Sequence, residues 1–500
     1  MDLTQLRKEF EDLQRKIVAV RHGISLIYYD GETVAPPGTA DNRMKSLEIL
    51  NDEMYKLKFG ERTMELMELL WEHESELSQL ERRALELLRR ETVRERNVPQ
   101  DLYVEYKNLV IMAQDAWHKA NENSDYEILK PYLEKIFDTS IEFSNYCNPD
   151  LDPYEYYLDN YEPGIGLETY DQVFDMIKRE IPPLLQAIME KPQPDDSCLK
   201  GDFSAEKQKE LSLYIMDLLG INMGRVALAT AEHPFSTSIG SHFDERIVTR
   251  FSRKDFTFSL FTMLYECGNV LYETGQDDNV AYTFIDASAS LGILESQSRF
   301  YEHVVGRGRA FIEFIYPKLL ELFPESLGDY HAEDLYFAVN KVEPGPIRIG
   351  SDEVSNNLHV LVRYELEKAL MNKSLSVNDL PDAWAENYKK YMGVEIKSPV
   401  EGVLQDIHWP HGAIGYFPSG VLGNIYAALM AERMQQDINF DECLREGNYK
   451  LINLWNRENV WRRAGLYDTN TVIEQYVGMT ISGEPYIKYL KDKYMAIYKL

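Results

Sequence analysis

A short stretch near the middle of the chain, Tyr265-Glu-Cys-Gly-Asn269, places a phenol, a carboxylate, a thiol and an amide within one predicted helix. Residues four positions apart lie on the same face of an α-helix, so Tyr265 and Asn269 share a face while Cys267 lies off it. Glu266 is a candidate general base, because a carboxylate accepts a proton when its surroundings tune its pKa. The spacing therefore predicts a polar cluster that could do acid–base chemistry.

A second carboxylate of interest is Glu295, in the stretch Glu295-Ser-Gln-Ser-Arg299. Paired carboxylates act as general acid and general base where their environments split their pKa values. If Glu266 and Glu295 face one cavity with no cation between them, one of them takes up a proton or a cation enters. These two glutamates are the candidate catalytic residues.

The elements that must position these groups are mostly helices. Between Thr63 and Arg94, leucine and alanine residues recur mostly every three or four positions with charged residues between them, and this pattern continues through most of the chain. Asp255 can cap the start of the helix that carries Glu266, and Gly275 can end it. The sequence predicts a mainly α-helical protein.

Two stretches depart from the helical pattern. Residues 225–230 (RVALAT) and 246–251 (RIVTRF) are rich in β-branched residues and have the length of strands, which predicts a small antiparallel β-sheet. Residues 231–245 between them are polar and contain glycine and proline, so we expect a loop at the rim of the sheet. Loops of this kind often carry functional residues.

Composition indicates one large globular unit. The chain has 500 residues, of which 44% are hydrophobic and 27% charged, and it contains no glycine-, serine- or proline-rich linker. We therefore interpret residues 1–500 as a single domain.

Charge and cysteine usage exclude several classes of partner. The formal net charge of -30 repels phosphate backbones and anionic membranes, so we expect neither nucleic acid nor a membrane as a partner. The four cysteines are far apart and suggest a reducing compartment. The amphipathic, charged N-terminal segment is not a secretory signal, and no apolar run approaches the ~20 residues that span a bilayer. A cytoplasmic location is the simplest expectation.

Five segments, taken in order, resemble the signature stretches of the Taq-type zinc carboxypeptidases, helical metallopeptidases that remove single residues from peptide C-termini. They are His233-Pro-Phe235, Asp244-Glu-Arg-Ile-Val-Thr249, Glu295-Ser-Gln-Ser-Arg299, Ile347-Arg-Ile-Gly-Ser-Asp352 and Gly402-Val-Leu-Gln-Asp-Ile-His-Trp409. Any one of them is a weak signal, because short words recur by chance. Their common order makes the resemblance specific, and further matches extend it from near residue 20 to the C-terminus.

The resemblance implies a zinc site that has lost its histidines. In that family an H-E-x-x-H helix and a later carboxylate hold zinc, which leaves one position for a water whose pKa falls to ~7. Here the two histidine positions are Tyr265 and Asn269, while Glu266 and Glu295 stand at the general base and the carboxylate ligand. Leu294 replaces a histidine that usually precedes that ligand. We therefore expect a degenerate metal site and no cofactor.

The resemblance also implies that the groups that recognise a peptide C-terminus survive. Arg348 belongs to the segment that supplies a guanidinium for the terminal carboxylate, and its planar fork can donate two parallel hydrogen bonds. Arg246, His233, His408 and Tyr416 match residues that line the same deep cleft. Taken alone, an arginine among acids is more often an internal ion-pair partner, and a histidine is more often a hydrogen-bonded core residue.

Three hypotheses follow. The leading one is a carboxypeptidase-like protein, a homodimer as is usual in the family, that binds a peptide C-terminus or a small carboxylate ligand without zinc-dependent hydrolysis. The second is an active carboxypeptidase in which Glu266, Glu295 and a histidine such as His233, His242 or His303 hold zinc or another divalent cation. The third is a metal-independent hydrolase that uses the two glutamates.

Overall fold

The protein is mainly α-helical, as expected: helices make up 68% of the chain in the computed structural model, which describes residues 2–463 and 465–500. The α-helices are α1 (Leu3–Thr33), α2 (Ala40–Phe59), α3 (Glu61–Trp71), α4 (Gln79–Arg96), α5 (Gln100–Asn123), α6 (Lys130–Cys147), α7 (Pro153–Tyr161), α8 (Leu167–Met189), α9 (Ala205–Leu218), α10 (Phe256–Thr274), α11 (Leu291–Arg299), α12 (Arg309–Leu322), α13 (Pro324–Leu327), α14 (Ala332–Val339), α15 (Ser355–Met371), α16 (Leu380–Met392), α17 (Pro418–Ile438), α18 (Phe440–Glu446), α19 (Tyr449–Asn459), α20 (Thr469–Thr471) and α21 (Glu484–Tyr498). Two π-helical segments, Phe300–Gly306 and Val472–Val477, continue α11 and α20.

The small β-sheet has three strands in the order β1 (Val226–Thr230), β3 (Glu245–Thr249) and β2 (Phe235–Ser238). The expectation of an antiparallel sheet built from the first and last of these stretches is wrong, because β1 pairs with β3 in parallel, from Val226 opposite Glu245 to Thr230 opposite Thr249. The polar stretch between them supplies β2, which pairs antiparallel with β3. The chain reverses once before β2 and once after it, so the outer stretches run in the same direction.

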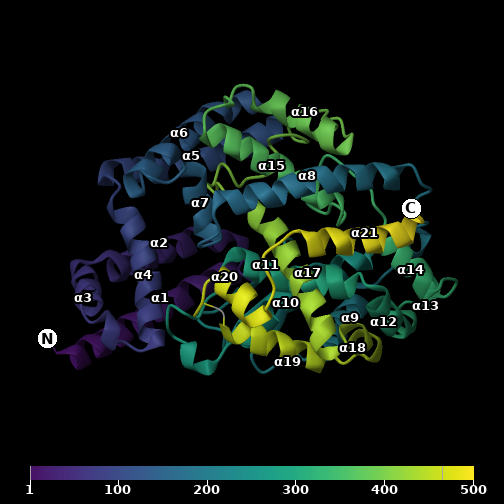
Figure 1. The fold of residues 1–500 in the computed structure, drawn as a ribbon, viewed down its shortest axis with the longest axis horizontal. Coiled ribbons are helices and arrows are strands. Elements are labelled where there is room, and N and C mark those ends of the chain that lie inside the picture. Colours follow the sequence, from purple (N-terminus) through teal and green to yellow (C-terminus); the bar gives the residue numbers. More distant parts are fainter. Residues whose placement is uncertain (1, 464) are drawn as a thin grey trace.

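Helices α10, α11 and α17 pack side by side at the centre of the molecule (Figure 1). Two glycines permit this close approach. A Cβ at Gly268 of α10 would lie 2.8 Å from the carbonyl carbon of Gln297 in α11, and a Cβ at Gly423 of α17 would lie 2.7 Å from the Cβ of Glu295. Helix α11, which carries Glu295, is therefore held between its neighbours by backbone contact.

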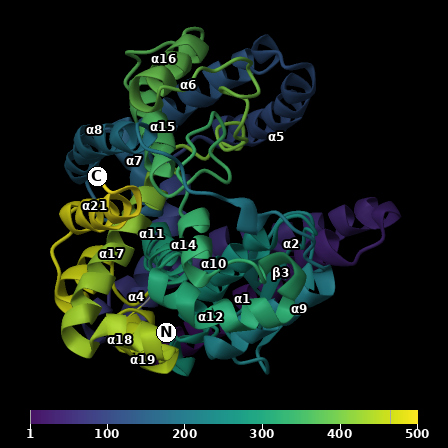
Figure 2. The ribbon, with the colours of Figure 1, turned by 90° about the vertical axis from the view of Figure 1, so that its right-hand side faces the viewer.

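Two clusters of buried apolar side chains support the helices. The larger includes Leu264 of α10, Ile293 of α11 and Ile425 of α17, each fully buried. The smaller joins α1, α3 and α4 to the segment that follows α10, through residues such as Leu85 and Ile285. Figure 2 shows α5, α6, α15 and α16 above the part formed by α9, α10, α12, α18 and α19. The single-domain interpretation stays a prediction. Within the described residues, no helix is long and apolar enough to cross a membrane.

Candidate functional site

Helix α10 begins and ends as its sequence predicts. The side chain of Asp255 accepts hydrogen bonds from the backbone N–H groups of Thr257 at 2.9 Å and Phe258 at 3.3 Å, and Gly275 follows the last turn. Most of the helix is buried, and it packs against β3 on one side and α11 on another. Its polar residues therefore lie inside the protein, where each needs a partner.

The phenol of Tyr265 is bonded across the helix interface to Glu295. Its hydroxyl donates to Oε1 of Glu295 at 2.9 Å. Burial, reinforced by the negative charge of Glu295, raises the pKa of Tyr265 well above its usual value. Tyr265 therefore keeps its proton at physiological pH and acts as a donor to the carboxylate.

Asn269, one turn further along α10, is engaged at both ends of its amide. Its Oδ1 accepts a hydrogen bond from the hydroxyl of Ser298 in α11. Its Nδ2 donates at 3.4 Å both to the hydroxyl of Ser236 in β2 and to Oε2 of Glu266. The amide thus joins α10, α11 and the sheet.

Glu266 lies in the same network and is 6% exposed. Ser236 donates a hydrogen bond to its Oε2 at 2.6 Å. Burial raises the pKa of Glu266 to about 7; the hydrogen bonds from Ser236 and Asn269 oppose this shift, and the charge of Glu295 adds to it. The two candidate catalytic carboxylates are therefore electrostatically coupled, and both forms of Glu266 are populated near neutral pH.

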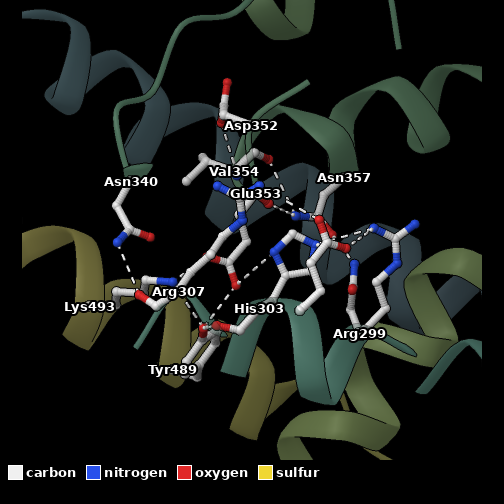
Figure 3. Close-up of polar contacts among 12 residues, drawn as sticks. Arg299, His303, Arg307, Asn340, Asp352, Glu353, Val354, Asn357, Tyr489 and Lys493 are labelled. Carbon is white, nitrogen blue, oxygen red and sulfur yellow. Dashed lines mark hydrogen bonds and ion pairs between the residues drawn. The ribbon is translucent and has the colours of Figure 1, made fainter. Parts of the chain in front are cut away.

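A buried polar network continues behind Glu295, and the sequence did not reveal it. Nε of Arg299 lies 3.5 Å from Oε2 of Glu295, and its guanidinium lies 5.4 Å from the centre of the Tyr265 ring. Figure 3 shows Arg299 beside His303, with a nitrogen–nitrogen distance of 3.2 Å, and His303 beside Glu353. Glu353 accepts hydrogen bonds from Tyr489 at 2.9 Å and from Lys493 at 2.7 Å. The guanidinium of Arg299 thus supplies the counter-charge for Glu295 from within the protein.

Arg348 is held in an internal ion pair with Asp406. Its Nη2 lies 2.8 Å from Oδ1 of Asp406, while the fully buried Arg363 donates from Nε to Oδ2 of the same carboxylate, also at 2.8 Å. Burial alone would raise the pKa of Asp406, but the charges of Arg363 and Arg348 hold it well below its usual range. Two arginines share one carboxylate, and the buried Glu367, which also interacts with the charge of Arg363, is only partly ionised at neutral pH because burial raises its pKa to about 7. The cluster therefore keeps part of its positive charge.

His408 and Tyr416 lie beside the two arginines. Their rings stack with centroids 4.7 Å apart and planes inclined by 27°, and Nδ1 of His408 lies 3.9 Å from Oδ1 of Asp406. Burial lowers the pKa of His408 to about 4, so its ring is neutral at physiological pH. Burial and the charge of Glu295 raise the pKa of Tyr416, which connects this ring to the α10–α11 cluster. Arg348, His408 and Tyr416 therefore form one group.

Two of the predicted site residues lie apart from this group. Arg246 of β3 donates from Nη2 to Oδ2 of Asp244 at 3.1 Å and lies 5.7 Å from the ring of Tyr29. His233 is exposed in the turn before β2, and no contact recorded for the described residues joins it to the others. Ser236, which the sequence analysis placed in a loop, contacts Glu266 instead; the neighbouring strand pairing, rather than any motif, brings it there.

A cavity of about 760 Å³ opens beside the cluster. No residue of α10 lines this cavity, and the residues nearest the candidate site in it are Leu294, adjacent to Glu295, and Tyr416. Most of the rest of its wall comes from α4, α5, α6, α7 and the segment before α11. Of the candidate site residues, Tyr416 is the one that lines this cavity.

The chain matches the carboxypeptidase Taq (M32) metallopeptidase family over residues 9–494. It is 34% identical to carboxypeptidase 1 of Bacillus subtilis (strain 168), over 100% of both chains. It is 31% identical to thermostable carboxypeptidase 1 of Pyrococcus furiosus, over 96% of this chain and 97% of the relative. The crystal structure of the M32 carboxypeptidase from Deinococcus radiodurans R1 superimposes with a TM-score of 0.95 at 29% identity, covering 99% of this chain and 100% of that one. The protein belongs to the carboxypeptidase Taq family.

Proposed function

We propose that this member of the family binds the C-terminal carboxylate of a peptide, or a small carboxylate ligand, without zinc-dependent hydrolysis. One observation carries the proposal: Tyr265, at a position where the resemblance expects a zinc ligand, donates a hydrogen bond to Glu295, the expected carboxylate ligand. The phenol and the carboxylate are hydrogen-bonded to each other, whereas two ligands of one metal ion would each direct an oxygen at the metal.

The remaining donors also fit zinc poorly. A tyrosine ligand must lose its proton, and burial stabilises the protonated form of Tyr265. Asn269 is a neutral oxygen donor whose Oδ1 already accepts from Ser298. Among the residues that the structure describes, no group of three or more histidine, cysteine, aspartate or glutamate side chains could hold a metal ion. The residues present do not fit the family's metal.

Of the histidines considered for an unusual metal site, one is exposed and two are engaged with other side chains. His233 is exposed, His242 is bonded through Nδ1 to Asp286 at 2.7 Å, and His303 packs against Arg299. Arg299 also supplies Glu295 with a positive charge. These contacts favour the proposal over a rearranged zinc site.

Retention of carboxylate binding is supported by the arginine cluster. Arg348 and Arg363 share Asp406, so an incoming carboxylate would neutralise the positive charge that the cluster keeps. Arg348 is the more accessible of the two, with 19% of its side chain exposed against none for Arg363. A ligand would therefore meet Arg348 first.

A second candidate function is metal-independent hydrolysis with Glu266 as general base. Its pKa of about 7 is suited to proton transfer at neutral pH, and a serine hydroxyl lies 2.6 Å from it. This function requires turnover that persists in a chelator and disappears in Glu266→Gln.

The deciding experiment combines metal analysis, binding and turnover on one preparation. Metal content is measured after purification without chelator, and N-acetyl-Ala-Phe is followed by calorimetry and by phenylalanine release, with and without added zinc or cobalt. Carboxypeptidase 1 of Bacillus subtilis is the control. We expect saturable binding, little bound metal and no metal-dependent release. Near-stoichiometric metal with chelator-sensitive turnover would overturn the proposal.

The homodimer and the cytoplasmic location are also proposals, carried by the family resemblance and by the acidic, cysteine-poor composition. Light scattering on the purified protein tests the first, and cell fractionation tests the second. A monomer across the micromolar range would contradict the dimer.

A further inference from the structure

The cavity beside Tyr416 is unusually rich in aromatic side chains, and we call it the tyrosine cavity. Its volume is about 760 Å³. Its lining is Leu87, Arg90, Glu91, Val98, Tyr103, Tyr106, Lys107, Phe143, Cys147, Tyr156, Tyr157, Asn160, Tyr161, Pro163, Ser288, Ala289, Ser290, Leu291, Leu294, Gly412 and Tyr416. Aromatic rings and aliphatic groups therefore make up most of its wall.

The deeper tyrosines of this wall bond to the protein through their hydroxyl groups. Tyr106 is hydrogen-bonded to the hydroxyl of Ser140 at 3.3 Å, and Tyr157 donates to the backbone carbonyl of Ser140 at 3.0 Å. With the hydroxyls tied to α6, these residues present ring surface to the cavity. Such a surface suits another aromatic ring, which packs on it edge-to-face or offset-stacked.

The inner end of the tyrosine cavity adjoins the carboxylate cluster. Tyr416 lines the cavity on one side and stacks on His408 on the other. Tyr161 meets Tyr416 edge-on, with ring centroids 5.7 Å apart and planes inclined by 83°. Within the part of the chain that the structure describes, no hydrogen bond is recorded for either hydroxyl. Tyr416 and His408 thus connect the cavity to the ion pair of Arg348 and Asp406.

Two of the three charged groups at the cavity are paired with neighbours: Arg90 with Asp159 at 3.0 Å, and Glu91 with Lys58. The third, Lys107, is exposed, and its ammonium lies 5.0 Å from the centre of the Tyr103 ring. An incoming charged side chain would lose its hydration without gaining a free partner from either pair, and an exposed ion pair with Lys107 would offset little of that cost. The wall thus disfavours charged side chains and favours large apolar ones.

We propose that the tyrosine cavity selects peptides by an aromatic or large apolar C-terminal side chain, while Arg348 and its neighbours hold the adjoining carboxylate. This inference rests on the proposed function and names its ligand class. A phenyl group buried among rings leaves water and gains directional ring contacts, whereas a hydrogen atom at the same position gains neither. Recognition therefore has a charged part and an apolar part, on opposite sides of the Tyr416 ring.

Calorimetry with three N-acetylated dipeptides tests the proposal on the intact protein. The ligands are N-acetyl-Ala-Phe, N-acetyl-Ala-Gly and N-acetyl-Ala-Asp, so that only the last side chain changes. We expect the phenylalanine ligand to bind at least about tenfold more tightly than the glycine ligand, and the aspartate ligand to bind most weakly. Equal affinities for the phenylalanine and glycine ligands would overturn the inference and leave the proposed function standing.

Two variants test whether this preference arises in the tyrosine cavity. Leu87→Trp fills the cavity from α4, and Tyr161→Leu removes one ring while keeping an apolar side chain. Each should reduce the phenylalanine-to-glycine affinity ratio to within about twofold. Leu213→Trp, at an exposed position of α9 outside the cavity, is the control and should keep the ratio. If both variants fold, as shown by circular dichroism, and keep the full preference, the side chain binds elsewhere and the inference is wrong.

The same measurements separate the two proposals. If the wild-type protein binds none of the three ligands, the proposed function itself fails. If all three ligands bind and Leu87→Trp keeps the preference for phenylalanine over glycine, only the inference fails. Should Leu87→Trp not fold, Tyr161→Leu provides the same test.

Discussion

The hydroxyl of Tyr265 donates a 2.9 Å hydrogen bond to Oε1 of Glu295, which joins α10 to α11 at the centre of the candidate site. Nε of Arg299 lies 3.5 Å from the other oxygen of the same carboxylate, Oε2. Glu295 is therefore stabilised by a neutral donor and a cation that both belong to the chain. The carboxylate of Glu295 is therefore stabilised by residues of the chain without a bound cation, and the consequences can be measured.

Replacing Tyr265 with phenylalanine should destabilise the protein, because it leaves a mostly buried oxygen of Glu295 without its donor. The expected loss in the free energy of unfolding is about 1–3 kcal/mol. Urea denaturation measures it. Tyr28→Phe, at an exposed position of α1, is the control and should change stability by less than about 0.5 kcal/mol. Equal effects of the two variants would contradict the role given to Tyr265.

The double variant Tyr265→His/Asn269→His should bind zinc. It places two imidazoles on one face of α10, with Glu295 opposite as the third ligand and Glu266 as base. Metal analysis should find close to one zinc per chain, whereas each single variant should bind poorly. We expect weak carboxypeptidase turnover until Leu294→His is added, because ligating imidazoles need supporting polar neighbours. A folded double variant with no more zinc than its parent would show that the site has diverged beyond its ligands.

Glu266 should make stability depend on pH in a defined direction. Its pKa in the folded protein, about 7, lies above the ordinary value of 4.5. Its contribution to stability is therefore fully present below pH ~4.5 and is lost as the pH rises toward ~7, by up to about 3 kcal/mol. Glu266→Gln should remove this part of the pH dependence.

Comparison of the wild type with Glu266→Gln isolates this effect from other buried carboxyls. As the pH rises from 4.5 to 8, the free energy of unfolding of the wild type should fall relative to that of Glu266→Gln. Glu446→Gln, at an exposed position, is the control and should track the wild type throughout. A difference that is constant across this range would show that Glu266 titrates normally.

Arg348→Ala should weaken binding of N-acetyl-Ala-Phe by at least about tenfold, because it removes the accessible guanidinium of the cluster. The amide N-acetyl-Ala-Phe-NH₂, which lacks the carboxylate, should lose little affinity in this variant. Lys488→Ala, which removes an exposed ion pair with Asp492, is the control. If acid and amide lose affinity equally, Arg348 acts through its ion pair with Asp406 rather than on the carboxylate of the ligand.

Much of the architecture could be predicted from local pattern. The apolar period of three to four residues marks helices such as α4, and Asp255 and Gly275 mark the ends of α10. Strand direction could not be predicted in this way. The segment Phe235–Ser238 contains two serines and has no strong alternation, so its identity as β2 depends on pairing with β3, which is a tertiary contact.

In the candidate site, too, local features could be predicted from the sequence and contacts between elements could not. The spacing of Tyr265 and Asn269 follows from helix geometry, and the structure joins both to Glu266 or Glu295. The partners that tune these groups, Ser236 and Arg299, could not be ranked from sequence, because each acts through a contact with another element. Arg348 could be an ion-pair partner or a ligand hook, and the pairing with Asp406 was visible only once the two segments were placed together.

Gly268 and Gly423 allow the side chains of this site to be exchanged without changing how the helices pack. They allow α11 to touch its neighbours backbone to backbone, so the distance between positions 265 and 295 is set by main-chain packing rather than by a bound ion. Side chains across such a fixed gap can be exchanged one at a time, because each newcomer meets the same opposing residue at the same spacing. Exchanges at positions 265 and 295 therefore do not require the helices to move. Gly268 and Gly423, by contrast, cannot be replaced in this way, because a side chain at either position would clash with α11.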